Sequence, residues 1–486
     1  MSWNSKAADD MNTMPWSVKD ILQATAGVLI QGDPDGQFSG LSIDSRRIAG
    51  DELFVAIKGE HHDGHDFIAD VTDAGIRGIL VEKHRLDKGF ADRYAGRGLI
   101  CIGVEDTRRA LGDLGGFRRR HAAVKIVAIT GSNGKTTTRE MTAGMLSERF
   151  EVLASEGNLN NDIGLPLTLF RLNSRHDWAV LELGMNHPGE ITRLGEICVP
   201  DIGVITNVGP SHLQGLGSIE AVARAKGELL ENIQPDGVAV LNADDPHITS
   251  LANQSPVKTC LYGQDNPDAA IRAESIADRG HEMSFNLVLP SENVAVDLKV
   301  PGRYMISNAL AAAAVGHLSG LPAAMIKAGL EKFRPVKGRM NLQKNSKGVN
   351  IVDDTYNANP LSTRAAMEAL SSLRKGNRSA LVLGDMLELG GLARDLHREI
   401  GRIAYKNGIE RLFLTGDHAA DVGEGALEAG MDASAILMGT KTEILGRLLS
   451  WMKSGDWILV KGSRTMKMET LVNDLLQEGH GKTKAI

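Results

Sequence analysis

The chain has 486 residues, of which 42% are hydrophobic and 24% are charged, and its formal net charge is -7. This length is too great for one ordinary core and predicts roughly two to four domains of a globular protein. The negative balance supplies no broad basic field, which argues against duplex DNA or an anionic membrane surface as a partner.

The three cysteines, Cys101, Cys198 and Cys260, lie far apart and show no metal-ligand spacing. This spacing favours a reducing cytoplasm over a disulfide framework. No apolar segment approaches the length of a membrane span, so membrane insertion is not expected. Residues 1–20 are polar and acidic, unlike a signal peptide, and are predicted to form a loose tail.

The first predicted domain spans residues 1–103. Short apolar strands alternate there with turns and small helices, and this pattern predicts a compact α/β fold. The expected strands include residues 53–57 and 79–81.

The second predicted domain spans residues 104–335, where strands and helices alternate along the chain. Such alternation predicts a parallel sheet wrapped by helices. It lapses after residue 259, and two antiparallel strands are expected before an alanine-rich helix resumes it. The expected strands are 178–182, 202–206, 237–241, 283–289 and 294–300, and the expected helices are 190–197, 218–233 and 307–318.

A phosphate-binding loop is predicted near the start of this second domain. An apolar run breaks into Gly131-Ser-Asn-Gly134-Lys135-Thr136 and continues into a helical pattern. Free backbone N–H groups and the positive end of the helix dipole would then face an anion. Lys135 would reach the outer phosphates, and the Thr136 hydroxyl would hold Mg²⁺. Residue 129 is isoleucine where the usual motif has glycine, so a structural turn is the alternative.

Three further residues of the second domain are candidates for chemistry. Glu182 closes an apolar strand, the position of a Mg²⁺ ligand or water-orienting group, although a helix N-terminal charge is the alternative. His212 follows the next strand at the same sheet edge, where open α/β sheets build their sites. A lone histidine is more often an ordinary hydrogen-bonded residue. Lys226, on the following helix, is expected from the pattern alone to be a solvated surface cation.

The third predicted domain spans residues 336–486 and repeats the alternation of strand and helix. It is expected to be Rossmann-like, but no G-x-G-x-x-G follows its first strand, so a dinucleotide site is not expected. The expected strands are 349–353, 380–384, 411–414, 435–438 and 457–460.

Five motifs together resemble the Mur ligase family of peptidoglycan synthesis, in family order and over nearly the whole chain. The family's phosphate loop reads Gly-x-x-Gly-Lys-Thr, which accounts for the shortened motif. The five are Thr130-Gly-Ser-Asn-Gly-Lys-Thr-Thr137, Glu156-Gly-Asn-Leu-Asn-Asn-Asp-Ile-Gly-Leu-Pro166, Glu182-Leu-Gly-Met-Asn186, Thr206-Asn-Val-Gly-Pro-Ser-His-Leu213 and Asp353-Asp-Thr-Tyr-Asn-Ala-Asn-Pro360.

The resemblance implies an α/β protein of three domains, with a central P-loop parallel-sheet ATPase domain, that works as an ATP-dependent peptide ligase. In such a ligase ATP converts a peptide carboxylate into an acyl phosphate, the incoming amine attacks, and ADP and phosphate are released. The implied substrates are UDP-N-acetylmuramoyl-tripeptide on the first domain, ATP on the second and D-alanyl-D-alanine on the third. The chain is expected to act as a cytoplasmic monomer that binds no nucleic acid.

The resemblance also assigns roles to individual residues. Lys135 would contact the ATP phosphates, Thr136 and Glu182 would bind one Mg²⁺, and His212 would bind a second. Lys226 falls where relatives carry a carbamylated lysine, which turns a cation into a carboxylate ligand. Lys135, His212 and Lys226 are thus the implied catalytic residues. Further implied ATP contacts are Gly131, Ser132, Asn133, Gly134, Thr137, Asn308, Arg339 and Asp354. Implied substrate contacts are Ser42, Asp44, Ser45, Arg46, Asp63, His65, Asn160, Tyr356, Asn357 and Asn359.

Three alternatives stay open at this stage. The residues of the first domain are also common in ordinary turns. A sibling ligase that adds the third amino acid shares the Asp-Ser-Arg segment. However, the loop from Gly384 to Gly390 and the lack of an Asp-Asn-Pro-Arg sequence disfavour that sibling. A P-loop ATPase that hydrolyses ATP only to change shape is the remaining alternative, and it would need no amine acceptor.

Overall fold

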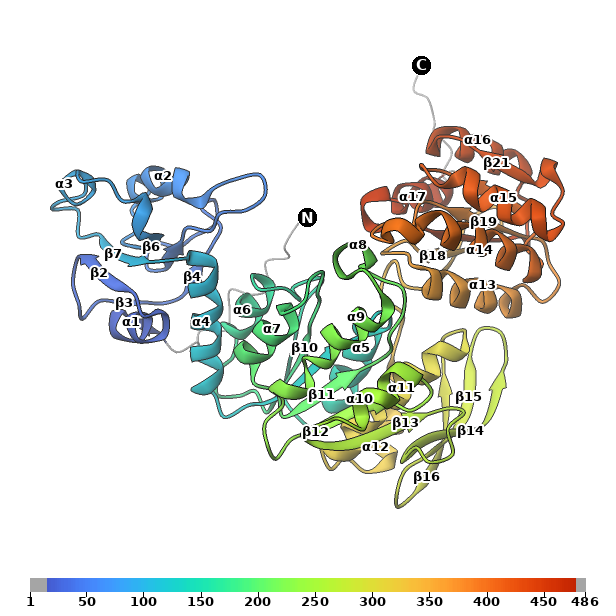
Figure 1. The fold of residues 1–486 in the computed structure, drawn as a ribbon, viewed down its shortest axis with the longest axis horizontal. Helices are drawn as coiled ribbons and strands as arrows, with labels where there is room; N and C mark the ends of the chain where they lie inside the picture. The colour runs from blue at the N-terminus through green and yellow to red at the C-terminus, as the bar shows by residue number, and fades with distance from the viewer. Residues whose placement is uncertain (1–14, 478–486) are drawn as a thin grey trace.

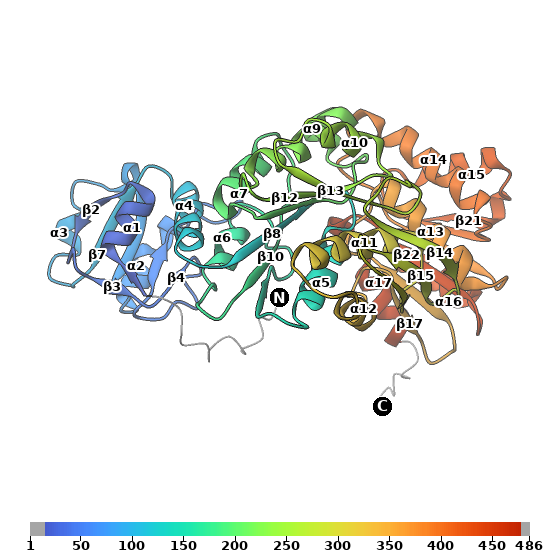
Figure 2. The same cartoon turned by 90° about the horizontal axis from the view of Figure 1, so that it is seen from below.

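A computed structural model describes residues 15–477 as three α/β domains in a row (Figure 1). The first and third domains lie at opposite ends of the central domain in both perpendicular views (Figure 2). The predicted divisions fall at the end of β7 (Ile100–Val104) and between α12 (Ala323–Lys332) and β17 (Asn341–Lys344), and the exact boundaries stay a prediction. Within residues 15–477, no helix is long and apolar enough to cross a membrane.

The first domain is built on a five-stranded sheet with the order β2-β7-β6-β5-β4. Its strands are parallel except that β2 runs antiparallel to β7. The bounds are β2 (Val28–Gln31), β4 (Leu41–Ser42), β5 (Leu53–Val55) and β6 (Gly78–Glu82), with helices α1 (Val18–Thr25), α2 (Ile68–Asp73) and α3 (Phe90–Arg93).

The predicted loose tail over residues 1–20 is wrong for its last six residues, while residues 1–14 lie outside the described part. Trp16 and Ser17 form β1, which pairs with β3 (Gln37–Phe38). Ser17 then caps α1 through a reciprocal side-chain arrangement with Asp20. Trp16, Val18 and Ile21 are buried in the core of the first domain. Burial of these apolar side chains orders a segment whose composition looks polar overall.

The central sheet has nine strands in the order β16-β15-β14-β13-β12-β11-β8-β10-β9. Pairing is parallel from β9 to β14, and β14, β15 and β16 are antiparallel, which confirms the predicted lapse. The bounds are β8 (Lys125–Thr130), β9 (Val152–Ala154), β10 (Trp178–Glu182), β11 (Ile202–Ile205), β12 (Val238–Asn242), β13 (Lys258–Gly263), β14 (Ile271–Asp278), β15 (Met283–Val288) and β16 (Asn293–Leu298).

Alternate residues of the central strand β8 enter two different cores, as the period of a strand requires. Val127 and Ile129 pack on one side of the sheet, and Ile126 and Ala128 on the other. The helices of this part of the chain are α4 (Thr107–Arg120), α5 (Lys135–Leu146), α6 (Gly164–Leu169), α7 (Glu190–Cys198), α8 (Leu213–Leu216), α9 (Ile219–Gly227), α10 (Pro246–Ala252), α11 (Arg303–Leu318) and α12.

One expected helix of the central domain is shorter in the structure, and two strands there were not expected. The helix expected over 218–233 ends at Gly227, a residue with low helix propensity, and a 3₁₀ turn at Leu230–Asn232 follows. Strands β13 and β14 were not predicted. Both have exposed polar residues at one end, which hides the apolar pattern of a buried strand.

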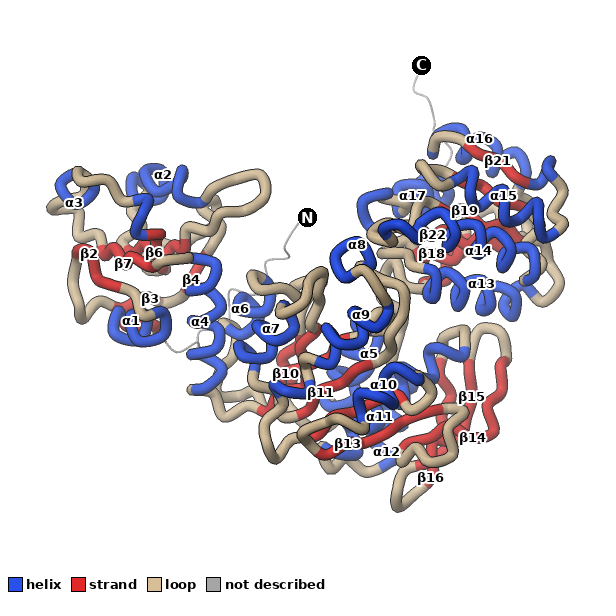
Figure 3. Tube along the Cα trace, viewed as in Figure 1, coloured by secondary structure: helices blue, strands red, loops and turns tan. Residues whose placement is uncertain are grey.

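The third domain has a six-stranded sheet in the order β17-β18-β22-β19-β20-β21, parallel except for β17. Helices cover both faces of this sheet (Figure 3), as expected for a Rossmann-like fold. The bounds are β18 (Asn350–Asp354), β19 (Ser379–Leu383), β20 (Arg411–Leu414), β21 (Ile436–Met438), β22 (Trp457–Lys461), α13 (Pro360–Arg374), α14 (Ala393–Lys406), α15 (Ala419–Ala429), α16 (Lys441–Trp451) and α17 (Glu469–Gln477).

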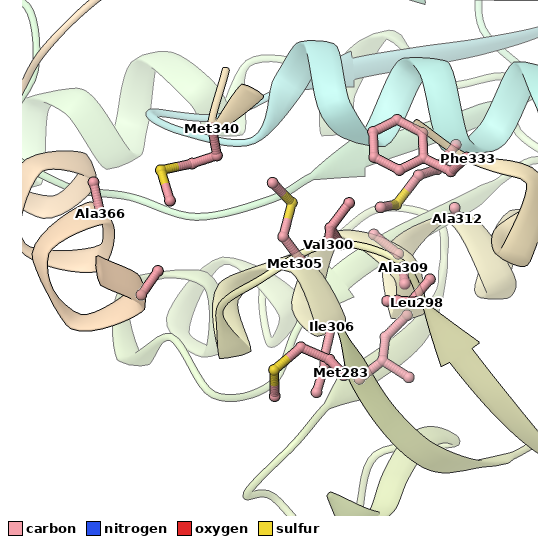
Figure 4. Packing of buried hydrophobic residues seen from close by; sticks show 14 of the residues in the cluster. Met283, Leu298, Val300, Met305, Ile306, Ala309, Ala312, Phe333, Met340 and Ala366 are labelled. Carbon is pink, nitrogen blue, oxygen red and sulfur yellow. The ribbon is translucent and has the colours of Figure 1, made fainter. Parts of the chain in front are cut away.

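One apolar cluster continues from the central domain into the third (Figure 4). The alanine-rich helix α11 is buried along most of its length, and its small side chains let neighbouring elements approach closely. Met340 and Ala366 of the third domain belong to the same cluster as Met305 and Ala309 of α11. The two domains therefore share buried apolar surface.

Candidate active site

A cavity of about 980 Å³ lies where the central and third domains meet. Its wall combines the phosphate loop, the ends of β10 and β11, the start of α11 and the segment after β18. Fifteen of the predicted site residues line it. They are Ser132, Asn133, Gly134, Lys135, Thr137, Asn160, Glu182, His212, Lys226, Asn308, Arg339, Asp354, Tyr356, Asn357 and Asn359.

The phosphate loop has the predicted order of strand, loop and helix, because β8 ends at Thr130 and α5 begins at Lys135. A Cβ on Gly131 would lie 1.9 Å from the Thr206 hydroxyl, and a Cβ on Gly134 would lie 2.2 Å from Oδ1 of Asn308. Gly134 also has a φ of +80°. Only glycine fits both positions, so the loop can follow the neighbouring strand end closely.

Thr136 contacts Glu182, which lines the cavity. The Thr136 hydroxyl donates a hydrogen bond to Oε2 of Glu182 at 2.9 Å, and Nδ2 of Asn160 donates to Oε1 at 3.0 Å. Glu182 is only 3% exposed. A buried carboxylate beside a hydroxyl offers the hard oxygen ligands that Mg²⁺ prefers. The residues present therefore fit a Mg²⁺ ion at this point.

Lys135 is half-buried at the cavity wall, and its Nζ donates a hydrogen bond to the Gly131 carbonyl at 2.8 Å. Burial lowers the pKa of this ammonium, while Glu182 raises it and Arg339 lowers it further. The side chain is thus folded back on its own loop. It can turn outwards when an anion offers a stronger partner than a carbonyl.

Lys226 is 1% exposed, so the expectation of a solvated surface cation is wrong. Burial, reinforced by the charge of Lys135, holds the pKa of the amine well below its ordinary value of 10.5. Within residues 15–477, the Nζ of Lys226 makes no hydrogen bond and no ion pair. A buried lysine without an anionic partner favours the neutral amine, which is the nucleophilic form.

His212 lies at the same edge of the sheet, at the start of α8, with a φ of +55°. Its Nδ1 lies 2.6 Å from Oε2 of Glu388 in the third domain. Carboxylate contact with one ring nitrogen leaves the other, Nε2, available to a ligand. His212 and Lys226 line the same cavity as Glu182, as the sequence-based hypothesis requires.

The third domain supplies the opposite wall. The Asp354 carboxylate accepts a hydrogen bond from the Met340 N–H at 3.1 Å and is paired with the buried Lys461. The Arg339 guanidinium lies over the Tyr356 ring at 4.1 Å. Such stacking holds the guanidinium in a fixed plane beside the cavity.

The structure does not bring the predicted residues of the first domain to this cavity. The pKa of Asp44 is lowered to about 2, chiefly by its hydrogen bond with Arg46. Asp63 contacts Nδ1 of His65 at 2.7 Å, and Nε2 of His65 accepts from the Glu82 N–H at 3.1 Å. These residues are therefore engaged inside their own domain, and their role in substrate binding stays a prediction.

Several cavity residues were missed by the sequence reasoning. Lys461 ends β22, and its position at the carboxyl end of a parallel strand was a usable signal. Tyr304 gave no such signal. Within the described range, its hydroxyl is buried and has no hydrogen-bond partner, although the side chain lines the cavity. Arg139 was also missed; it does not line the cavity, but its Nη1 lies 3.5 Å from Oε2 of Glu182 and donates to the Gly157 carbonyl.

Comparisons with known proteins agree with this arrangement. Family models match three successive segments: the catalytic domain of the Mur ligase family at 37–119, the Mur ligase middle domain at 129–316, and the Mur ligase glutamate ligase domain at 338–464. The UDP-N-acetylmuramoyl-tripeptide--D-alanyl-D-alanine ligase of Escherichia coli is 38% identical over 92% of this chain and 95% of its own.

Solved structures show the same similarity in three dimensions. A crystal structure of MurF from Acinetobacter baumannii matches with a TM-score of 0.88 and 32% identity, over 96% of this chain and 100% of that one. MurF from Thermotoga maritima in complex with ADP matches with a TM-score of 0.80 and 26% identity, over 90% and 97%.

Proposed function

The chain belongs to the Mur ligase family, and we propose that it is the ATP-dependent ligase that joins D-alanyl-D-alanine to UDP-N-acetylmuramoyl-tripeptide. The observation that carries the proposal is the cavity where a glycine-bounded phosphate loop, the Thr136–Glu182 pair and the edge of a second parallel sheet meet. The similarity to ligases of this activity extends over all three domains.

ATP occupies the central side of this cavity in our proposal. The N–H groups at the start of α5 and the Lys135 ammonium face the phosphates, where they offset the charge that develops during transfer. Asn308, Arg339 and Asp354 lie around the rest of the nucleotide. Thr136 and Glu182 would hold one Mg²⁺ ion and His212 with Lys226 a second, and bound Mg²⁺ would neutralise phosphate oxygens.

Lys226 can take part in cation binding only after modification, because an ammonium repels a cation. The neutral amine can add to CO₂, forming an N–C bond and releasing one proton, which leaves a carbamate with a carboxylate-like charge. The depressed pKa of Lys226 supplies that neutral amine, and Lys226 lines the same cavity as His212, which would offer a second ligand. We propose this modification as part of the active enzyme.

The other two substrates are assigned to the flanking domains. Residues 1–103 would hold the UDP end through Ser42, Asp44, Ser45, Arg46, Asp63 and His65, residues 104–335 ATP, and residues 336–486 the dipeptide. Tyr356, Asn357 and Asn359 follow the carboxyl end of β18, where an open α/β sheet binds its ligand. Closure of the first domain onto the cavity would exclude water from the acyl phosphate. The enzyme would act as a cytoplasmic monomer.

Phosphate release with different amines tests the proposal. The purified protein receives ATP, Mg²⁺ and UDP-N-acetylmuramoyl-tripeptide, and D-alanyl-D-alanine should then start phosphate release. A site that satisfies a buried amide disfavours ligands that lack it, so free diaminopimelate or lysine should give far lower rates. Equal rates with a free diamino acid would indicate the sibling ligase. Rapid release without an amine would indicate an ATPase switch.

A further inference from the structure

Glu388 contacts the central domain with both its backbone and its side chain. It lies in the loop between β19 and α14 of the third domain. Its carbonyl accepts a hydrogen bond from the Gln214 N–H at 3.0 Å, and its Oε2 lies 2.6 Å from Nδ1 of His212. One residue of the third domain thus fixes the short helix α8 and the imidazole that precedes it.

The backbone at both ends of this contact is unusual. His212 has a φ of +55° and Glu388 a φ of +64°, and neither residue is glycine. Residues with side chains rarely adopt the left-handed region, and where they do the surrounding structure must hold them there. The two side chains meet across the domain boundary. Two such residues in contact point to a function of the contact.

The Glu388 carboxylate lies outside the cavity wall, whereas the His212 side chain is part of it. Histidines that bind metals commonly engage a carboxylate through the ring nitrogen that faces away from the metal. That second contact fixes the tautomer and the orientation of the ring. Nδ1 lies 2.6 Å from the Glu388 carboxylate, although the angle of the contact is outside hydrogen-bond geometry in this structure. A small rotation of the ring would make it a hydrogen bond from Nδ1–H, which would leave the lone pair of Nε2 free for a ligand.

We propose that Glu388 is a positioning residue that orients His212 for metal binding, so that docking of the third domain is required to complete the second cation site. This inference rests on the proposed function, in which His212 holds a Mg²⁺ ion. It goes further by making metal affinity depend on a carboxylate from another domain. The cation site would then be complete only when the acceptor-binding domain is in place.

Mn²⁺ binding to the full chain tests the inference. Binding is followed by electron paramagnetic resonance with ADP present in bicarbonate buffer. Glu388→Gly suits the left-handed backbone and removes the carboxylate. It should therefore weaken Mn²⁺ binding at the site that depends on His212 by roughly 10–100-fold. Glu388→Gln keeps an acceptor oxygen and should retain most of the affinity. Glu410→Ala is the matched control, because Glu410 lies just before the amino end of β20 in the same sheet. This variant should bind Mn²⁺ with the affinity of the wild type.

Two further measurements separate the inference from the function on which it rests. Glu388→Gly should have no additional effect in a His212→Ala background, because the carboxylate acts through the imidazole. Ring-nitrogen NMR should show His212 losing its fixed Nδ1–H tautomer in Glu388→Gly. Wild-type or tighter Mn²⁺ binding by Glu388→Gly overturns the inference alone. Unchanged binding by His212→Ala overturns the proposed metal role of His212 as well.

Discussion

The side-chain amide of Asn359 donates a hydrogen bond to Oδ1 of Asn133 at 2.8 Å, which joins the third domain directly to the phosphate loop. The same residue caps α13, because its Oδ1 accepts from the Ser362 N–H at 2.9 Å. Asn359 thus ties the start of a helix in one domain to the nucleotide site of another. This double role allows its two contributions to be separated by substitution.

Asn359→Ser should lower kcat/KM without lowering stability. Serine is a good helix cap but is too short to reach Asn133, so only the contact between domains is lost. A neutral hydrogen bond is worth about 1 kcal/mol, which corresponds to about fivefold in rate. Asn359→Ala should show the same loss of kcat/KM. Because it also removes the helix cap, its free energy of unfolding should fall by ~1 kcal/mol. Asn377→Ser, at an exposed position after α13, serves as the control. A wild-type kcat/KM for Asn359→Ser would refute a kinetic role for the contact between Asn359 and Asn133.

Lys135→Ala should lose phosphate transfer while the protein stays folded. Its ammonium is half-buried and bonded only to a loop carbonyl, so its removal should leave the melting temperature nearly unchanged. The rate should fall by on the order of 10²–10³-fold, as for other preorganised charge-stabilising groups. Lys347→Ala, in an exposed turn, should match the wild type in both measurements. Near-normal turnover by Lys135→Ala would remove Lys135 from the mechanism.

Lys226→Ala should be severely impaired, and added short-chain carboxylates should restore part of its activity by occupying the position of the carbamate. Wild-type enzyme freed of CO₂ should be slow and should recover when bicarbonate is added. Intact mass spectrometry loses carbamates readily, so ¹³C NMR with labelled bicarbonate is the appropriate measurement. An active Ala variant with no bicarbonate dependence in the wild type would contradict the proposal.

The buried amine of Lys226 also predicts a pH dependence of stability for the unmodified protein. Because the folded pKa lies well below 10.5, the unfolded chain binds a proton that the folded chain does not at any pH between the two values. The free energy of unfolding should therefore rise with pH through that window. In CO₂-free buffer, Lys226→Met should be more stable than the wild type at pH 7, and the difference should shrink towards pH 10. A constant difference would show that Lys226 is charged in the folded state.

Tyr304→Phe should raise the KM for ATP several-fold and leave the melting temperature unchanged or higher. The hydroxyl is buried in the cavity wall without a partner, so removing it leaves nothing newly unpaired in the protein. Tyr262→Phe is the comparison, since that hydroxyl donates to the Thr206 carbonyl at 3.1 Å and its loss should destabilise the protein by ~1 kcal/mol. An unchanged KM for Tyr304→Phe would mean that the hydroxyl faces no ligand.

Much of this arrangement was predictable from sequence because it depends on local patterns. The phosphate loop, the antiparallel strands β15 and β16 and most strands of the third domain follow from hydrophobic periodicity and glycine positions. Lys226 shows the limit: its helix was expected, but whether its side chain faces solvent or the interior depends on how that helix packs. The contact between His212 and Glu388 is equally invisible in the sequence, because 176 residues separate them and only domain docking brings them together.

Because α11 and the third domain share an apolar cluster, the free energy needed to separate the two domains should depend on temperature. Moving Ala366 and Met340 away from Met305 would expose apolar surface to water, and such exposure raises the heat capacity. Hydrophobic attraction weakens on cooling, so separation should become easier at low temperature. If release of the finished peptide requires that separation, its rate should follow a curved Eyring plot rather than a straight one.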